Sequence, residues 1–356
     1  MNCAKPMSLD TPKNISRRME EKMKIWEGYQ KGINLGGWLS QCDHTKERYE
    51  TFITEEDVKK ISTWDIDHVR VPIDYNLVED ENGNYKESGF TYIDRIISWT
   101  EKYHLNMILD LHKTAGYSFD AGEKEEGFFE SESYQERFYK LWEELAGRYG
   151  KYSHVAFELL NEVTDKEYMK TWLRVSDTCI KRIRAITPDT DILVGGYYNN
   201  SIVSVPDLAP PQDDHIVYNF HCYDPVIFTH QGAYWVAGMP SDFRIGINTT
   251  YRDLYENALK YFPGQNGIFE QIADLDAPFG EEFFTELFKE AVQVAEERNV
   301  RLYCGEHGVI DLANKEDEEK WYRYIRAAFE RYHIGSAAWN YKEMDFDLSD
   351  GRFFHK

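Results

Sequence analysis

The sequence predicts a single (β/α)8 barrel of the TIM type, an α/β fold in which eight parallel strands alternate with helices. Eight short apolar runs recur along the 356 residues, and charged amphipathic segments separate most of them. The runs are almost continuously apolar rather than alternating, as in strands that are buried on both faces of a parallel sheet. Strand–helix alternation repeated in this way favours a closed barrel with helices on its outside.

Each apolar run is short enough for one strand, and each amphipathic segment is long enough for one helix. The expected strands are Gly32–Trp38, His68–Pro72, Asn106–His112, Val155–Asn161, Asp191–Gly196, His215–Tyr223, Arg301–Glu306 and Gly335–Asn340. The expected helices are Thr54–Trp64, Phe90–Tyr103, Ser133–Tyr149, Lys166–Ile186, Glu281–Arg298 and Asp317–Tyr332. Thr54 followed by Asp57 resembles a capping box, which marks a helix start.

One connection is much longer than the others. It follows the sixth strand, contains one obvious helix and is rich in Tyr, Phe, Gly and Pro. Long insertions of this kind in barrels lie at the ends of strands and carry function. We therefore expect a lid insertion at about residues 224–280, above the C-terminal face of the barrel.

The two ends of the chain depart from a regular barrel. Only Tyr341–Lys356 follow the eighth strand, which is too short and loop-like for a closing helix. Residues 1–30 precede the barrel domain at 31–356, and within them Ser16–Tyr29 is charged with apolar residues at helical spacing. We expect this extension to be helical and hypothesise that it covers the face that the missing last helix leaves bare. The alternative is a mobile extension with no fixed place.

The composition excludes several classes of function. Sixty-three acidic against 41 basic residues leave a net charge of −22, which disfavours nucleic acids and anionic membranes and favours a neutral or cationic ligand. No apolar run approaches the roughly 18 residues of a membrane span. The first residues lack the apolar core of a signal peptide, so we expect a cytoplasmic protein, or a secreted one whose signal is missing from this sequence. We also expect a monomer.

Function in a (β/α)8 barrel is found at the C-terminal ends of the strands. Two carboxylates stand out there, because Glu162 and Glu306 each follow an apolar strand. These are the fourth and seventh strands, whose ends face each other across the barrel. Glycoside hydrolysis needs such a pair, one as the acid and one as the nucleophile or the base. A carboxylate separation of about 5–5.5 Å gives retention, and about 6.5 Å or more gives inversion. The sequence leaves that separation open.

Other polar and aromatic groups at the strand ends suit the same chemistry. They can keep a nucleophile ionised, bind sugar hydroxyls or stack on a pyranose ring. These supporting candidates are Arg70, His112, Asn161, His221, Tyr223 and Trp339. Each of these residues alone has an ordinary structural explanation. Because all six are expected on one rim, at the same end of the barrel, together they favour a catalytic site there.

A metal site is the alternative reading of part of this rim. Asp110, His112 and His221 are residue types that bind zinc or manganese. The sequence has no HExxH motif, and its five scattered cysteines are not spaced as ligands. We therefore expect neither a metal nor another cofactor.

The residues at these strand ends resemble glycoside hydrolase family 5, the cellulase family. The matching segments are Gly32–Trp38, Val69–Pro72, Leu109–His112, Leu160–Glu162, His221–Tyr223, Gly305–Glu306 and Trp339. The likeness runs from about Lys31 to Leu348. It implies a retaining β-glucanase without a metal, with Glu162 as the acid/base and Glu306 as the nucleophile. Lys113 and His307 depart from the family pattern without removing a catalytic group.

The resulting prediction is an endo-β-glucanase acting on β-1,4-glucans and mixed-linkage β-glucans by double displacement. The alternatives are the same chemistry on β-mannan or β-1,3-glucan, and a non-catalytic carbohydrate-binding barrel. The candidate substrate-binding residues lie at or beyond the strand ends, and they are Asn34, Trp38, Tyr117, Asn199, Phe228 and Trp235. For Tyr117 and Phe228, loop packing is the alternative role. Linkage, chain-length preference and endo or exo mode remain open at this point.

Overall fold

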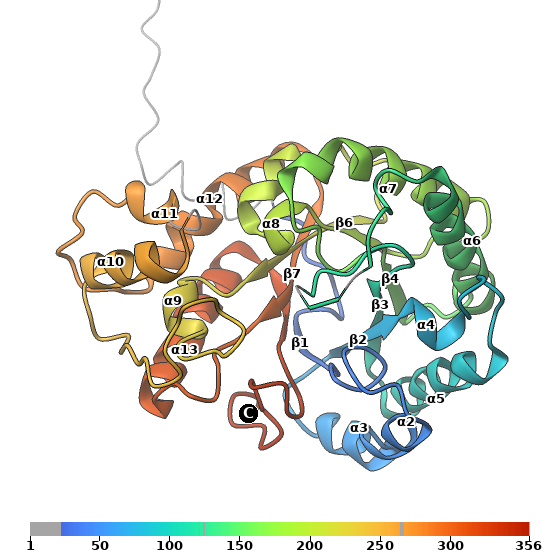
Figure 1. Ribbon diagram of the computed structural model, residues 1–356, viewed down its shortest axis with the longest axis horizontal. Coiled ribbons are helices and arrows are strands. Elements are labelled where there is room, and N and C mark those ends of the chain that lie inside the picture. Colours follow the sequence, from blue (N-terminus) through green and yellow to red (C-terminus); the bar gives the residue numbers. More distant parts are fainter. Residues whose placement is uncertain (1–22, 121, 124, 264–266, 356) are drawn as a thin grey trace, which may run out of the picture.

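The computed structural model describes residues 23–355 except 121, 124 and 264–266. Its centre is a closed barrel of eight parallel strands that follow one another in chain order (Figure 1). The strands are β1 (Lys31–Asn34), β2 (His68–Asp74), β3 (Asn106–Lys113), β4 (Val155–Glu158), β5 (Ile192–Val194), β6 (Ile216–Cys222), β7 (Arg301–His307) and β8 (Gly335–Ala338). Each strand overlaps one of the predicted apolar runs, so the predicted barrel is confirmed.

Long helices form the outer layer, and all six predicted helices are present. The helices of this layer and the short turns beside them are α2 (Lys46–Thr51), α3 (Glu55–Ile61), α4 (Tyr75–Val78), α5 (Glu87–Tyr103), α6 (Glu132–Tyr149), the 3-10 turn η1 (Lys166–Tyr168), α7 (Met169–Arg184), α12 (Glu282–Glu297) and α13 (Lys315–Tyr332). The predicted capping box starts α3, where the Asp57 carboxylate accepts from the Thr54 backbone N–H at 2.8 Å.

The alternation of strand and helix is less regular than the sequence suggested. Between β5 and β6 there is no long helix, only α8 (Tyr197–Asn200) and the 3-10 turn η2 (Ile202–Asp207). After β8 the described residues form no helix either. One of the seven connections between strands, and the described chain after β8, thus lack a long helix.

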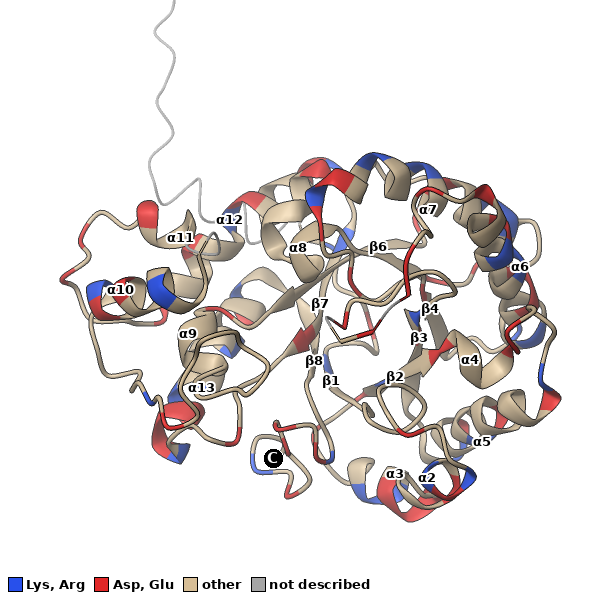
Figure 2. Cartoon of the chain, viewed as in Figure 1, with Lys and Arg blue, Asp and Glu red and all other residues tan. Residues whose placement is uncertain are grey.

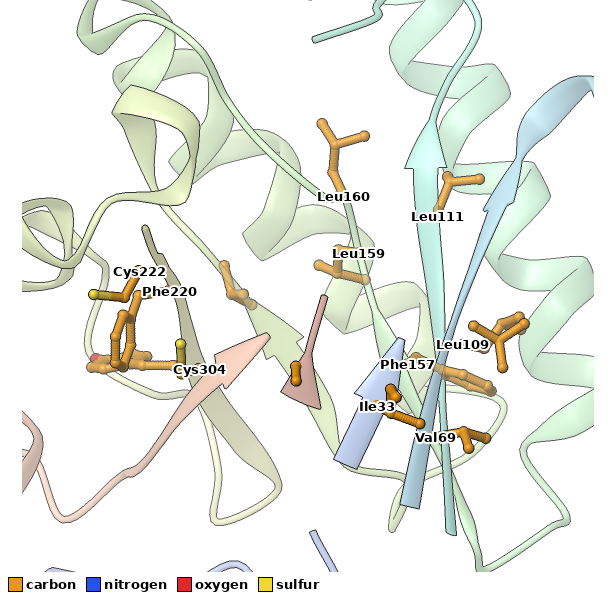
Figure 3. Close-up of a cluster of buried hydrophobic side chains, with 14 of the residues drawn as sticks. Ile33, Val69, Leu109, Leu111, Phe157, Leu159, Leu160, Phe220, Cys222 and Cys304 are labelled. Carbon is orange, nitrogen blue, oxygen red and sulfur yellow. The ribbon is translucent and has the colours of Figure 1, made fainter. Parts of the chain in front are cut away.

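Strand side chains alternate between the helix layer and the barrel interior. Ile33, Val69, Leu109 and Phe157 belong to the large apolar cluster that the strands share with the helices, part of which Figure 3 shows. The residues between them point inward. At the N-terminal end of the barrel these inward residues form a second buried cluster, which contains Trp26, Tyr29, Ile108, Ala156, Leu193, Val217, Tyr303 and Ala337.

The chain before β1 contributes to this second cluster and closes the N-terminal end of the barrel. The rings of Trp26 and Tyr29 stack at 3.9 Å, and Trp26 meets Tyr303 edge-on at 5.2 Å. The Trp26 indole N–H donates to Asp191 at 2.7 Å. Residues 23–30 contain no helix, so the predicted helix over Ser16–Tyr29 is wrong in its described part. Its earlier part lies outside the described residues.

The chain after β8 covers the position of a closing helix. The ring of Phe354 stacks on Trp64 next to α3, with 5.7 Å between the ring centroids and 4° between their planes. The backbone oxygen of Phe354 accepts from the Asp65 N–H, and the Tyr341 hydroxyl donates to Asp57. The C-terminal coil therefore fills this gap. The described part of the N-terminal extension, residues 23–30, closes the N-terminal end of the barrel instead, and the rest of the hypothesis falls outside the described residues.

The insertion after β6 has two parts, with α9 (Val226–Thr229) in the first and α10 (Tyr251–Tyr261) and α11 (Gly267–Glu270) in the second. In the first part, Trp235 packs near Phe346, beside the end of β8. In the second part, Tyr251 stacks on Phe283 of α12, and the second part lies to the side of the barrel (Figure 1). Of the described insertion, the first part borders the strand ends, and a lid role for it stays a prediction.

Charged residues of both signs are distributed along the outer helices, as Figure 2 shows for α6, α7 and α13. Within the described part of the chain, no helix is both long and apolar enough to cross a membrane.

Replacing Trp26 with alanine should lower the free energy of unfolding by about 3–5 kcal/mol, because it removes a large ring from a closely packed cluster. The side chain is only 2% exposed, and it also loses its hydrogen bond to Asp191. Urea unfolding followed by tryptophan fluorescence and far-UV circular dichroism measures the change. Ile25→Ala is the control, because that neighbouring side chain is 44% exposed and its removal should cost less than about 1 kcal/mol. Equal losses in the two variants would contradict a specific role of Trp26.

Candidate active site

The second buried cluster fills the N-terminal part of the barrel interior, and the inward strand positions that follow it towards the C-terminal ends of the strands are polar. The residues of this layer come from β1, β2, β3, β4 and β6, and each is fully buried: Asn34, Arg70, Asp110, Glu158 and Asn219. Asp110, Glu158 and Asn219 each lie two residues beyond an inward apolar residue of the second cluster, as the alternation of a strand requires. The lower half of the barrel interior is thus an apolar core, and its upper half is a polar network.

Arg70 is the centre of this network. Its Nε and Nη2 donate to the two oxygens of Glu158 at 2.7 and 2.8 Å, and Nη1 donates to Glu306 Oε1 at 2.8 Å. Asp110 Oδ2 lies 3.0 Å from Nη2. Burial by itself lowers the pKa of the guanidinium, but the carboxylates of Asp110, Glu158 and Glu306 outweigh it and hold that pKa above its ordinary value. The arginine therefore carries a permanent charge that orients the carboxylates around it.

Glu306 reaches the interior through an irregularity in β7. The register between β6 and β7 shifts at this point, so that Phe220 pairs with Cys304 but His221 pairs with Glu306. An extra residue in one strand reverses the alternation beyond it, which turns Glu306 inward. Gly305 occupies the shift, and a Cβ there would lie 2.8 Å from the Asn219 side chain. The strand therefore needs glycine before Glu306.

Both oxygens of Glu306 accept hydrogen bonds from fixed donors. Oε1 accepts from Arg70, and Oε2 accepts from the Tyr223 hydroxyl at 2.8 Å. The carboxylate is thereby fixed in orientation beside a positive charge. A fixed orientation of this kind suits a carboxylate that attacks a substrate atom directly.

Glu162 lies on the segment after β4, and both of its carboxylate oxygens have polar neighbours. Oε1 lies 2.8 Å from His221 Nδ1, and Oε2 accepts from Asn199 Nδ2 at 2.8 Å. Burial raises the pKa of Glu162 to about 7, against the opposing effects of Asn199 and Arg70. A carboxyl with a raised pKa is protonated near neutral pH, as a general acid must be.

Glu162 and Glu306 face each other across a short gap. One oxygen of each carboxylate and one nitrogen of His221 all lie within 4.8 Å of one another. Side-chain atoms in this arrangement are also a possible cation site. The charge of Arg70 beside Glu306 opposes a second cation there, and the oxygens of both carboxylates already have hydrogen-bonding partners. The donor set therefore fits an acid–nucleophile pair better than a metal.

Two histidines support the pair as neutral groups. Burial lowers the pKa of His221 to about 4 and that of His112 to about 3. His112 Nδ1 lies 2.5 Å from Asp110 Oδ2, and the His112 ring is parallel to the Trp339 ring at 5.8 Å. Both rings are uncharged at pH 7, so they act through hydrogen bonds and packing rather than as proton donors.

The strand ends bring together both predicted catalytic residues and all six supporting candidates. Asn161 belongs to this group because its Oδ1 accepts from Arg70 at 2.7 Å. Trp339 is 6% exposed and packs with Phe346 and Ala233 of the insertion. The residues that the sequence predicted from separate strands therefore form one continuous site.

Three of the predicted substrate-binding residues are wrong, because Asn34, Trp38 and Phe228 have no exposed surface. The Asn34 side chain accepts from Arg70 and donates to the Gly305 carbonyl, so it supports the network from within. The Trp38 ring packs in the core and its indole N–H donates to a backbone oxygen. Phe228 is part of the apolar core.

The other three candidates have different positions. Tyr117 is 6% exposed, and its hydroxyl donates to the Glu162 carbonyl, so it packs the loop under Glu162 rather than lining the surface. Asn199 contacts the Glu162 carboxylate directly. Trp235 is 44% exposed beside Phe346 and stays a candidate for substrate stacking.

The sequence reading missed Glu158 and Asn219 as members of the site. Glu158 holds Arg70 with both oxygens and also accepts from Asn219 at 2.7 Å. The available signal was a polar residue at every second position inside apolar strands. Asn219 and His221 show that spacing in β6, as Asp110 and His112 do in β3.

The two departures from the family pattern have structural roles. Lys113 is buried and forms ion pairs with Asp120 at 2.6 Å and with Glu123 at 2.7 Å, which hold the loop between β3 and α6. His307 packs near Trp321 on the helix side of the barrel, and burial lowers its pKa to about 3. Neither side chain interrupts the network around Arg70.

Replacing Glu158 with glutamine should cost about 3–5 kcal/mol of unfolding free energy, because it leaves the buried Arg70 charge without one of its counter-ions. Urea unfolding of the parent and the variant measures this loss. Glu87→Gln is the matched control. It removes a carboxylate that is 73% exposed and pairs with Arg148 on the surface, so the expected loss is below about 1 kcal/mol. A loss in Glu158→Gln as small as in the control would mean that the network does not stabilise the fold.

Known proteins with similar sequences and folds accord with this geometry. A family model described as Cellulase (glycosyl hydrolase family 5) matches residues 27–345. Cellodextrinase A of Ruminococcus flavefaciens is 46% identical over 308 residues, which are 86% of this chain and 84% of that protein. Endoglucanase C of Acetivibrio thermocellus is 40% identical over 327 residues, which are 90% and 93% of the two chains. A solved endoglucanase from Thermotoga maritima shares the fold, with a TM-score of 0.72 at 22% identity over 95% of this chain and 96% of that one.

Proposed function

Because the chain belongs to glycosyl hydrolase family 5, we propose that it is a retaining endo-β-glucanase that cleaves β-1,4-glucosidic bonds by double displacement. The family membership makes the chain a glycoside hydrolase and agrees with the resemblance seen in its motifs. The proposal adds the stereochemistry, the linkage and the mode of attack. Its substrates are cellulose-type glucans, including soluble oligosaccharides, and mixed-linkage β-glucans.

The observation that carries the retaining mechanism is the short gap between Glu162 and Glu306. Their nearest carboxylate oxygens lie within 4.8 Å of each other. Retaining glycosidases have carboxylates about 5–5.5 Å apart, whereas inverting enzymes need about 6.5–9.5 Å for the attacking water. The gap leaves no room for a water between the nucleophile and the sugar, which favours direct attack by a carboxylate.

In the first step, Glu306 attacks the anomeric carbon while Glu162 gives its proton to the glycosidic oxygen. The C–O bond to the leaving sugar breaks, and a covalent glycosyl–Glu306 ester forms. Arg70 and Tyr223 hold the attacking carboxylate in line. In the second step, the Glu162 carboxylate takes a proton from a water that attacks the same carbon, and Glu306 leaves as a carboxylate.

The substrate class rests on the relatives and on the character of the cleft rim. The two similar proteins are named a cellodextrinase and an endoglucanase, so the proposed substrates include both short and long β-glucans. The exposed Trp235 ring offers a stacking face for a pyranose. The net charge of −22 suits a neutral polysaccharide.

The stereochemistry of the first product tests the mechanism. Proton NMR during early hydrolysis of cellotetraose should show the β-anomer of the new reducing end before it mutarotates. The α-anomer as the first product would exclude the double displacement. In parallel, a 2-deoxy-2-fluoro-cellobioside with a dinitrophenyl leaving group should label the protein once, and peptide mass spectrometry should locate the label on Glu306.

Activity assays test the substrate class. Reducing-sugar release from barley mixed-linkage β-glucan, carboxymethylcellulose, β-mannan and β-1,3-glucan in the presence of EDTA should be highest on the first two. Glu306→Gln should lower kcat by at least about 10⁴-fold on every substrate, because the nucleophile is lost. Binding of cellotetraose without turnover by the parent would favour the non-catalytic carbohydrate-binding alternative, and turnover of mannan alone would replace the glucan assignment.

The pH dependence follows from the buried acid. Glu162 must be protonated in the free enzyme to donate its proton, and burial raises its pKa to about 7. The value of kcat/KM for cellotetraose should therefore be retained below pH 7 and should fall as the pH rises through about 7. Initial rates from pH 4 to 9 measure this fall in kcat/KM on the alkaline side of the pH profile, which is its basic limb. A fall centred between pH 4 and 5 would contradict the role of Glu162 as a buried acid.

A further inference from the structure

The turn that follows β5 has an unusual backbone. Tyr198, Asn199 and Asn200 are consecutive residues with φ angles of 53°, 54° and 57°. Left-handed conformations are uncommon for residues other than glycine, and each one costs free energy that its surroundings must offset. Three in succession next to a catalytic residue suggest that the turn serves a geometric requirement.

The surroundings of the turn hold it in this conformation. The buried side chain of Asn200 accepts from the Gly196 N–H at 2.9 Å, inside the turn itself. On its other side, the backbone N–H groups of Tyr198 and Asn199 donate to the carbonyls of Thr164 and Val163, at 3.2 and 3.1 Å. The turn is therefore bound directly to the segment that follows Glu162.

This attachment brings the Asn199 side chain to the acid. Its Nδ2 donates to Glu162 Oε2 at 2.8 Å. The backbone of Glu162 is held independently, because its carbonyl accepts from the Tyr117 hydroxyl at 2.8 Å. Asn199 is thus the group that restrains the carboxylate itself from the side of β5.

We propose that Asn199 is a positioning residue of the reaction, which fixes the orientation of the Glu162 carboxyl group and strengthens it as an acid. This inference rests on the proposed function, because it concerns the acid/base of the double displacement. An N–H donor on Oε2 stabilises the carboxylate, which is the product of proton donation in the first step and the base in the second. The left-handed conformation of residues 198–200 places this N–H donor beside the Glu162 carboxylate.

The other charged and titratable groups around Glu162 come from several elements. His221 approaches from β6, Glu306 from β7 and Arg70 from β2. Asp110 acts from β3, Tyr223 from the end of β6 and Asp120 from the loop after β3. Of these, Asp120 raises the pKa of Glu162 and Arg70 lowers it. Removing the Asn199 amide leaves these groups in place, so the contribution of Asn199 to the acidity of Glu162 can be measured separately.

Asn199→Gly is the first test, because glycine adopts the left-handed conformation without strain and removes only the side chain. A hydrogen bond to a charged group contributes about one pKa unit or more. The basic limb of kcat/KM for cellotetraose should therefore move up by roughly one pH unit. At pH 6, kcat/KM should fall by about tenfold.

The dependence on the leaving group separates a positioning role from a loss of structure. With 2,4-dinitrophenyl cellobioside, departure needs no proton, so kcat/KM of Asn199→Gly should remain within about threefold of the parent. A misfolded or loosened site would lose activity on both substrates alike. Equal losses on the two substrates would therefore overturn the inference.

Two further variants keep the test decisive. Tyr198→Gly relaxes the same turn without touching Glu162 and should leave the basic limb at the pH of the parent. Asn199→Asp keeps the size and the left-handed tolerance but replaces the donor with an acceptor, and it should move the limb up by at least as much as Asn199→Gly. An unshifted limb in both Asn199 variants, in folded protein, would overturn the proposal. An inactive parent would instead refute the proposed function.

Discussion

The pairing of one buried guanidinium with three carboxylates is the constraint on which the rest of the site depends. Arg70 has no exposed surface, and Asp110, Glu158 and Glu306 surround it. A buried charge is tolerated only when it is paired and hydrogen-bonded. Each partner must therefore reach the barrel axis from a different strand, and this requirement sets the register of those strands relative to one another. Glu306, the proposed nucleophile, is one of the counter-ions, so the same interaction would stabilise the fold and orient the attacking carboxylate.

The second catalytic group is held by a different kind of support. Glu162 lies beyond the end of its strand, and its position depends on side chains and turns rather than on strand register. Tyr117 holds its backbone, and His221 and Asn199 contact its carboxylate. One carboxylate is thus bound to the Arg70 guanidinium, whereas burial raises the pKa of the other to about 7. This difference in environment supports the proposed roles of Glu162 as the acid and Glu306 as the nucleophile.

The barrel and most of the site could be predicted from the sequence, because strands buried on both faces leave continuous apolar runs and barrels place function at the strand ends. Glu158 and Asn219 were missed, since the two-residue spacing of polar positions inside an apolar run marks an inward face but does not by itself mark a functional site. Trp38 and Phe228 were substrate-binding candidates, with loop packing as the alternative for Phe228, because an aromatic residue beyond a strand looks the same in sequence whether it packs inward or outward. Tertiary packing alone decides such cases. The same limit explains why residues 23–30, which have helical spacing, form an irregular segment instead.

The closure of the barrel by Trp26 and Tyr29 has a consequence for the electric field inside it. These rings add a further layer between the water at the N-terminal end of the barrel and the inward apolar side chains beneath the polar layer. Interactions between charges weaken many-fold as the local dielectric constant rises towards that of water. By excluding solvent from below, the two rings keep the medium around Arg70 weakly polarisable. The attraction between its guanidinium and the nucleophile therefore retains its strength, although the rings lie at the opposite end of the barrel from the substrate.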